Sequence, residues 1–284
     1  MKPSPFDYHA PTTVAAALDL LREFGGDARL LAGGQTLVPM MNFRLAAPSV
    51  IVDLNRVKEL DFIEASGDVV RIGAMTRQRT LEFSPLIAEK LPLLNKVIRM
   101  VGHLPTRSRG TVGGSLANAD SAAELPMALQ VLEGEVVVAG PNGQRAIKAA
   151  DLFIDSMVTS LEEDEILIEV RLPVMSPNAR FAADEFSRRR GDFAIAAVAT
   201  VLTFEEGRCK TARLATAGVS PASTRLSAAE QLLEGEVIDA DAIARAGEAA
   251  AEAIEPMADR NASEAYRRHL TKTLTMRVLD RAMQ

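Results

Sequence analysis

The chain has 284 residues, of which 48% are hydrophobic and 25% are charged. This balance is typical of a folded globular protein rather than a disordered or fibrous one, and the length exceeds the roughly 150 residues of a single domain, so two compact units are expected. The formal net charge of -6 excludes a broadly basic surface, which nucleic acids and anionic membranes would attract. The charge leaves other proteins and small ligands as possible binding partners.

Residues that could hold a metal are scarce. The single cysteine, Cys209, cannot form an internal disulfide, and it cannot hold an iron–sulfur cluster, which needs about four thiolates. His9, His103 and His269 lack the spacing of a zinc site, so we interpret them as surface or capping residues. Because no apolar signal segment follows Met1 and no stretch approaches the ~18 apolar residues of a spanning helix, we expect a cytoplasmic protein without a transmembrane segment.

The first elements surround a glycine pair. Pro11-Thr12-Thr13 precedes an apolar stripe and predicts a helix that ends at Gly25-Gly26. A short apolar run at Leu30-Leu31 and a β-branched strand at 49–54 follow, so Gly33-Gly34 is expected between extended segments. Further along, the hydrophobic pattern predicts a strand at 68–72 and one helix from 85 to 101.

A second glycine pair, Gly113-Gly114, follows that helix. The stretch Pro173 to Asn178 is typical of a linker and places a domain boundary near residue 176. The part after the boundary is an α+β module. The expected elements after the second pair are a helix at 122–132, strands at 135–139, 165–172, 193–204 and 211–219, and alanine-rich helices at 241–254 and 262–283.

Two segments carry the functional prediction: Ala32-Gly33-Gly34-Gln35-Thr36 and Thr111-Val112-Gly113-Gly114-Ser115. A glycine pair permits positive φ and a close ligand approach, which a diphosphate needs, and consecutive N–H groups can converge on an anion. Each segment also ends in a hydroxyl residue, which adds a side-chain donor. One pair alone is commonly only a turn, as at Gly25-Gly26. Two pairs of the same pattern, in a chain without the Rossmann or P-loop motif, favour a different kind of nucleotide site.

Motifs over nearly the whole chain resemble one family, the flavin-binding medium subunits of molybdenum hydroxylases such as carbon monoxide, quinoline, nicotine and xanthine dehydrogenases. The segments that carry the resemblance are residues 31–41, Val52-Asp53-Leu54-Asn55-Arg56, residues 107–115, Glu165-Ile166-Leu167, Arg189-Arg190-Gly191-Asp192-Phe193 and residues 266–270. The resemblance implies an α+β fold with a PCMH-type (vanillyl-alcohol-oxidase-like) FAD-binding domain over residues 1–176. Its subdomains would cover about 1–57 and 58–176, and a carbon monoxide dehydrogenase flavoprotein-like α+β domain would cover 177–284.

The same resemblance implies an FAD site without catalytic or metal-binding residues of its own. The two glycine segments should wrap the diphosphate, Glu124 matches an acidic position near the ribityl or adenosine portion, and Leu167 matches an adenine contact. Val101 lies where the family often places a residue against the flavin, and Phe193 is the candidate aromatic beside the isoalloxazine. The candidate cofactor-binding residues are Leu31, Ala32, Gly33, Gly34, Gln35, Thr36, Leu37, Val101, Thr111, Val112, Gly113, Gly114, Ser115, Glu124, Leu167 and Phe193.

Several positions depart from the family or allow a simpler interpretation. Ser121 replaces a usual proline, Gln35-Thr36 replaces a common His-Ser pair, and Glu185 stands near a flavin-contacting lysine of some relatives, so no role is transferred to it. Asp120 and Glu124, four residues apart, are interpreted as nucleotide-side or dipole-compensating acids rather than an acid–base pair. Arg188-Arg189-Arg190 is interpreted as a solvated or subunit-facing surface, and Met40-Met41 as core filling.

The resemblance implies an electron-transfer subunit. In such enzymes the substrate is hydroxylated at a molybdenum cofactor in a large subunit, and electrons pass through two 2Fe-2S clusters in a small subunit to FAD, whose isoalloxazine performs the redox step. This chain would pass them to an external acceptor, which the sequence leaves open among NAD, a quinone, oxygen and a redox protein. A dimer of heterotrimers is expected.

The substrate would be an N-heteroaromatic compound, carbon monoxide, a purine or an aldehyde, and the pocket that selects it lies in the large subunit. The single cysteine excludes the benzoyl-CoA-type reductases of the family, whose equivalent subunit holds an extra cluster. Two alternatives differ in kind. A stand-alone FAD-dependent oxidoreductase of the same fold is disfavoured by the scarcity of histidines, and a flavin-free scaffold subunit is disfavoured by the two intact glycine segments.

Overall fold

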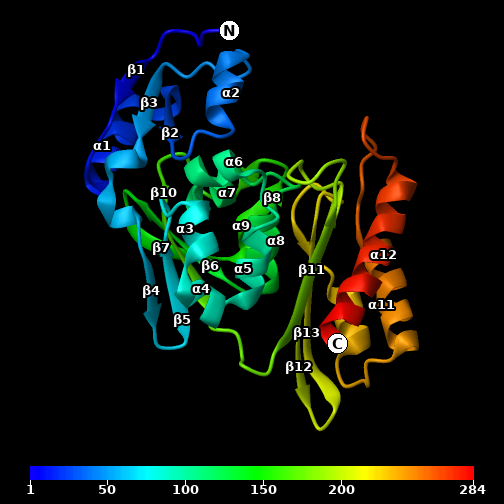
Figure 1. The fold of residues 1–284 in the computed structure, drawn as a ribbon. Coiled ribbons are helices and arrows are strands. Elements are labelled where there is room, and N and C mark those ends of the chain that lie inside the picture. The colour runs from blue at the N-terminus through cyan, green and yellow to red at the C-terminus, as the bar shows by residue number, and fades with distance from the viewer.

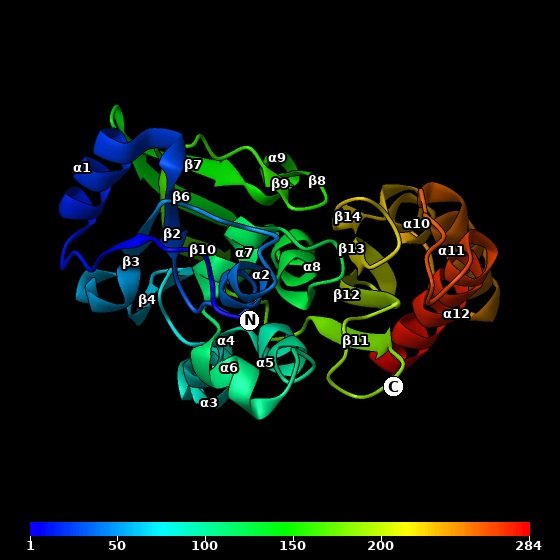
Figure 2. The ribbon, with the colours of Figure 1, turned by 90° about the horizontal axis from the view of Figure 1, so that it is seen from above.

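The computed structural model describes residues 1–284, and Figures 1 and 2 show three units side by side in chain order. The N-terminal unit has a parallel sheet in the order β1-β3-β2, made of β1 (Asp7–His9), β2 (Ala28–Leu31) and β3 (Val50–Asp53). Helix α1 (Val14–Phe24) begins where the Thr13 side chain accepts the Ala16 N–H and ends at Gly25, whose φ is +50°. The short helix α2 (Leu37–Asn42) follows β2.

The middle unit has an antiparallel five-stranded sheet in the order β4-β5-β10-β6-β7. Its strands are β4 (Ile63–Ser66), β5 (Val69–Gly73), β6 (Glu135–Gly140), β7 (Gly143–Lys148) and β10 (Ile166–Pro173). Its helices are α3 (Gln78–Phe83), α4 (Pro85–Lys90), α5 (Pro92–Ile98), α6 (Leu104–Arg109), α7 (Val112–Asn118), α8 (Glu124–Val131) and α9 (Ala149–Leu152). A small hairpin of β8 (Phe153–Asp155) and β9 (Val158–Thr159) completes it.

The C-terminal unit has an antiparallel sheet in the order β11-β12-β13-β14, and its helices lie on one side of it, as Figure 1 shows for α11 and α12. Helices α10 and α12 contact the strands, and α11 packs against these two helices. The elements are β11 (Arg180–Phe186), β12 (Ala196–Glu205), β13 (Arg208–Ala217), β14 (Thr224–Arg225), α10 (Ser227–Leu233), α11 (Ala240–Ala253) and α12 (Glu264–Met283). Along β12, Ala196 and Val198 face the core under these helices, whereas Ala197 and Ala199 belong to the core of the middle unit. The small alanines let the sheet approach the middle unit closely.

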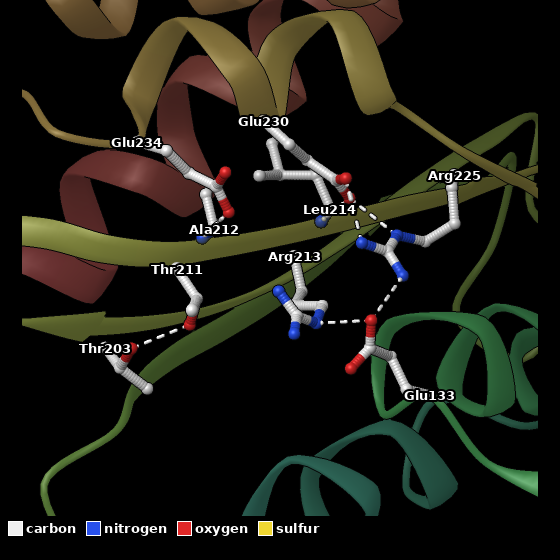
Figure 3. Close-up of polar contacts among 9 residues, drawn as sticks. All are labelled: Glu133, Thr203, Thr211, Ala212, Arg213, Leu214, Arg225, Glu230 and Glu234. Atoms are coloured by element: carbon white, nitrogen blue, oxygen red, sulfur yellow. Dashed lines mark hydrogen bonds and ion pairs between the residues drawn. The ribbon is translucent and has the colours of Figure 1, made fainter.

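Charged side chains fasten the C-terminal unit to the end of α8, as Figure 3 shows. The Glu133 carboxylate lies 2.7 Å from Arg213 Nε and 3.3 Å from the Arg225 guanidinium. Arg225 also donates to Glu230, which accepts the Leu214 N–H at 2.7 Å. The network therefore links α8, β13, β14 and α10. Because α8 starts at Glu124, it connects this interface to the region of the glycine segments.

The structure confirms the predicted α+β class and most predicted elements, with three local corrections. The single helix expected from 85 to 101 is two helices, because Pro92 lacks a backbone N–H and starts α5 as a new helix. Gly33-Gly34 lies between a strand and a helix rather than between extended segments. Gly113-Gly114 lies inside the first turn of α7 rather than in an open turn. None of the helices is long and apolar enough to span a membrane.

Candidate functional site

The first glycine segment leaves β2 with a row of free backbone donors. Gly34 has φ of +71°, so the positive φ expected from the sequence is confirmed there. The backbone N–H groups from Gly33 to Leu37 donate no hydrogen bond within the protein, and Thr36 precedes α2 without a side-chain cap. Unpaired N–H groups at the start of a helix can hold an anion. The segment is therefore a candidate phosphate cradle.

The second glycine segment is the capped start of α7. Thr111 Oγ1 accepts the Gly114 N–H at 3.1 Å, and the Gly113 N–H donates to the Ala74 carbonyl at 2.8 Å. Neither Gly113 nor Gly114 has positive φ. A Cβ on Gly113 would lie 2.5 Å from Ala74 Cβ, and one on Gly114 would lie 2.6 Å from Thr111 Oγ1. These glycines are needed for close packing rather than for a left-handed backbone.

The two glycine segments lie against each other. A Cβ on Gly33 would overlap the Arg109 carbonyl oxygen, and a Cβ on Gly114 would lie 3.1 Å from Ala32 Cβ. At Gly33 backbone therefore packs on backbone, and at Gly114 the backbone packs against the small Ala32 side chain. The sequence predicted positive φ and close approach of a ligand at these glycines, and the structure shows that they also allow two loops from different units to meet.

Asn55 and Arg77 stabilise the junction of the two glycine segments through hydrogen bonds. Asn55 Nδ2 donates to the Ala32 carbonyl at 2.9 Å, and its Oδ1 accepts from Arg77. Arg77 also donates to the Arg109 carbonyl, so the Asn55–Arg77 pair links Ala32 of the first glycine segment to a residue two positions before the second. Burial and the neighbouring Arg109 lower the pKa of Arg77. Because Asn55 lies just after β3 and Arg77 just before α3, the clamp joins the N-terminal and middle units.

A cavity of about 860 Å³ opens along the two segments and draws residues from all three units. All candidate cofactor-binding residues line it except Leu31 and Val112. Val112 is buried in the core of the middle unit, where its N–H donates to the Thr76 carbonyl at 3.0 Å. The lining candidates are Ala32, Gly33, Gly34, Gln35, Thr36, Leu37, Val101, Thr111, Gly113, Gly114, Ser115, Glu124, Leu167 and Phe193. Phe193 enters from the C-terminal unit and is 63% exposed.

Glu124 brings an unusual carboxyl group to the cavity. Its side chain is only 3% exposed, and burial raises its pKa to about 8, with further contributions from Glu185 and Asp120. Burial also raises the pKa of Glu185 to about 7, helped by Asp184 and opposed by Arg190. Glu124 is therefore protonated at neutral pH, and its carboxyl group can donate a hydrogen bond as well as accept one.

Comparison with known proteins identifies the chain. Residues 4–175 match the family model described as the FAD binding domain in molybdopterin dehydrogenase, and residues 181–282 match the CO dehydrogenase flavoprotein C-terminal domain. The chain belongs to this flavoprotein family. The resemblance inferred from the sequence motifs is thereby confirmed, and the protein is an FAD-containing oxidoreductase subunit.

The relatives match along their full length. The 6-hydroxypseudooxynicotine dehydrogenase complex subunit alpha of Paenarthrobacter nicotinovorans is 39% identical over 284 residues, which is 100% of this chain and 96% of the relative. The carbon monoxide dehydrogenase medium chain of Hydrogenophaga pseudoflava is 34% identical over 282 residues, covering 99% and 98%.

Solved structures of the family agree with the fold. The carbon monoxide dehydrogenase from Hydrogenophaga pseudoflava which lacks the Mo-pyranopterin moiety superposes with a TM-score of 0.98 and 36% identity, covering 100% of this chain and 99% of the other. Quinoline 2-oxidoreductase from Pseudomonas putida 86 gives a TM-score of 0.94 and 38% identity, covering 99% and 98%.

The cavity fits the flavin that the family implies. Its volume lies within the ~300–1,000 Å³ of small-molecule sites, and the free N–H groups of residues 33–37 supply backbone donors for a diphosphate. Gln78, which is 4% exposed, also lines the cavity, and its Oε1 has no hydrogen-bond partner. A buried polar atom of this kind is costly unless a ligand pairs with it.

Some lining residues were missed in the sequence. Gln78 and Thr106 are ordinary helix residues there, and Asn118 carries no motif, so only the packing of α3, α6 and α7 brings them together. Met40 also lines the cavity, although the sequence favoured a core-filling role, while Met41 is buried as expected. No cluster of three or more histidine, cysteine, aspartate or glutamate side chains is arranged to hold a metal ion.

Proposed function

We propose that FAD lies along the cavity with its diphosphate at the junction of the two glycine segments. The observation that carries this proposal is the run of unpaired backbone N–H groups from Gly33 to Leu37 at the cavity wall. Thr111, which caps the start of α7, and Ser115 in its first turn line the same cavity. Leu167 at one part of the wall and Phe193 at another offer apolar surfaces for the two ring systems.

The chain's own groups bind and orient the cofactor rather than catalyse substrate chemistry. When bound, the flavin supplies the redox step. The protonated Glu124 can hold a hydrogen bond at the ribityl chain or ring, and the Asn55–Arg77 clamp keeps the two glycine segments in place. We assign the cofactor-contacting role to the predicted residues, with Leu31 and Val112 supporting the wall from outside the cavity.

We further propose that the chain works as the medium subunit of a heterotrimer, assembled as a dimer of heterotrimers in the cytoplasm. A large subunit would hold the molybdenum cofactor and select the substrate, and a small subunit would hold the 2Fe-2S clusters that reduce the flavin. The names of the relatives, a medium chain and a complex subunit, support the heteromeric assembly. The matches over 4–175 and 181–282 support a division into an FAD-binding domain of residues 1–176 and a second domain of 177–284.

The test is the identity of the bound flavin. Purified chain or complex should show the two-banded flavin absorption and release FAD, not FMN, on denaturation. A colourless complex would favour the flavin-free scaffold, and substrate oxidation by the isolated chain would favour the stand-alone oxidoreductase. Capture of the complex from its native source should yield a large molybdenum-binding chain and a cysteine-rich small chain.

A further inference from the structure

Asp53 is a buried carboxylate at the end of β3, the central strand of the N-terminal sheet. It is 8% exposed and does not line the cavity. Three donors converge on its oxygens: the Tyr8 hydroxyl, the Asn55 backbone N–H at 2.9 Å and the Asn55 Nδ2. Burying a carboxylate is costly unless donors pair with it, so these hydrogen bonds fix the position of Asp53.

Asp53 dictates the orientation of the Asn55 side-chain amide. Asn55 Nδ2 donates to Asp53 Oδ1 and to the Ala32 carbonyl oxygen, which lies 2.9 Å away. Asn55 Oδ1 accepts from Arg77. An amide turned by half a rotation would exchange its oxygen and its nitrogen. Because a carboxylate accepts hydrogen bonds and has none to donate, Asp53 admits only the orientation in which the Asn55 NH2 group faces it and the Ala32 carbonyl.

The Asn55 amide in turn sets the direction of the first N–H group in the phosphate cradle. The Ala32 carbonyl and the Gly33 N–H belong to one planar trans peptide, so they point in opposite directions. With the carbonyl held by Asn55, the Gly33 N–H points away from Asn55 and has no acceptor within the protein. The Gly33 nitrogen lies at the junction of the two glycine segments, because a Cβ on Gly114 would be 4.0 Å from it. Asp53 therefore controls a donor that it does not touch.

Tyr8 anchors Asp53 from the edge strand β1. Strand β1 pairs in parallel with β3, and Tyr8 lies opposite Ile51, two residues before Asp53. The hydrogen bond to Asp53 raises the pKa of Tyr8, so the Tyr8 hydroxyl stays protonated and donates at neutral pH. A continuous chain of hydrogen bonds thus runs from Tyr8 through Asp53 and Asn55 to Ala32.

We propose that Asp53 is a positioning residue of the FAD site. Acting through Asn55, it turns the Ala32–Gly33 peptide so that the Gly33 N–H meets the diphosphate, and Tyr8 keeps Asp53 in place. The inference rests on the proposed binding of FAD in the cavity. A residue with this role changes the surroundings of the phosphates without changing those of the flavin ring. Its effect also disappears when the Asn55 amide is removed.

The test uses the full chain and FAD. Asp53→Asn keeps the shape of the side chain but places a donor where only an acceptor fits, and Asn55→Ala removes the amide. The two changes are also combined in one double variant. Asp68→Asn, an exposed position between β4 and β5, is the matched control. Equilibrium dialysis measures FAD affinity, phosphorus NMR of the bound FAD reports on its phosphates, and urea unfolding of the FAD-free chain measures stability.

We expect Asp53→Asn and Asn55→Ala each to weaken FAD binding by about tenfold, and Asp68→Asn to bind as wild type does. The double variant should bind within about twofold of the weaker single variant, because Asp53 acts through Asn55. The phosphorus resonances should move in Asp53→Asn while the flavin absorption keeps its position. A purely structural role for Asp53 would lower the stability of the chain and leave these resonances in place.

Equal FAD affinity of Asp53→Asn and Asp68→Asn would overturn the inference, and so would additive losses in the double variant. If Asp53→Asn does not fold, Tyr8→Phe decides, because Tyr8 is 55% exposed and phenylalanine removes only its hydroxyl. Tyr8→Phe should then bind FAD several-fold more weakly than wild type, and an unchanged affinity would overturn the inference. Absence of FAD binding by the wild-type chain would instead contradict the proposed function.

Discussion

Replacing the buried carboxyl of Glu124 by an amide should make the FAD-free chain more stable at neutral and alkaline pH. Glutamine has nearly the same shape and cannot ionise, so Glu124→Gln removes the cost of burying a charge while keeping the packing of α8. The effect should be absent in acid, where the carboxyl of the wild type is neutral in both the folded and the unfolded chain.

The sign and size follow from the pKa of Glu124, which rises from 4.5 in the unfolded chain to about 8 in the folded one. The folded state binds the proton more tightly, so its stabilisation is complete below pH 4.5 and is lost as the pH rises towards 8. At about 1.4 kcal/mol per pKa unit, the loss at pH 7 is on the order of 3 kcal/mol. Glu124→Gln should escape this loss.

Urea unfolding of both proteins at pH 5, 7 and 8 measures the difference. Glu165→Gln is the control of opposite sign, because the Arg145 guanidinium at 2.7 Å lowers the pKa of Glu165 and stabilises its charged form. That variant should be less stable than wild type by a nearly constant amount at pH 5, 7 and 8, because the stabilisation from a lowered pKa is already complete above the unfolded value of 4.5. If wild type and Glu124→Gln have the same pH dependence between pH 5 and 8, Glu124 is not buried as the structure shows.

Three further outcomes are expected. Gly114→Val should abolish FAD retention, because the valine side chain would collide with Thr111 Oγ1 and Ala32 and separate the two glycine segments. An unchanged ratio of FAD to protein in the purified variant would refute the contact between the two segments. Arg77→Met removes the charged hydrogen bonds to Arg109 and Asn55, so FAD affinity measured by equilibrium dialysis should fall by about tenfold or more. An affinity equal to that of wild type would show that these hydrogen bonds are dispensable for FAD binding. Iron analysis of the isolated chain should read near zero because Cys209 is the only cysteine, and stoichiometric iron would contradict a separate cluster-bearing partner.

The glycine segments illustrate how far local sequence can lead. Positive φ was predicted for the pairs and is found at Gly34, where the chain turns from β2 towards α2. The same reasoning was wrong for Gly113 and Gly114, which are helical and serve close packing against Ala74 and Thr111. The neighbours of a glycine along the chain do not reveal which distant backbone it must accommodate.

The environment of Glu124 and Gln78 could not be predicted from the residues next to them in the sequence. The sequence indicated that Glu124 lies near a nucleotide, but nothing in its immediate sequence predicts a pKa of about 8. That value depends on burial in the folded chain and on Glu185, which lies in the C-terminal unit on β11, far from Glu124 in the sequence. Gln78, with its unpaired Oε1 at the cavity wall, was missed for the same reason.

By itself the sequence determined the α+β class, most helices and strands, the family and the two segments that form the junction, because periodicity, prolines and glycine motifs are local properties. Only the tertiary structure decided that the junction is held by Asn55 and Arg77 and that Phe193 crosses from the C-terminal unit. Those features depend on contacts between residues far apart in the chain, and burial, proximity and pKa arise only when the three units pack together.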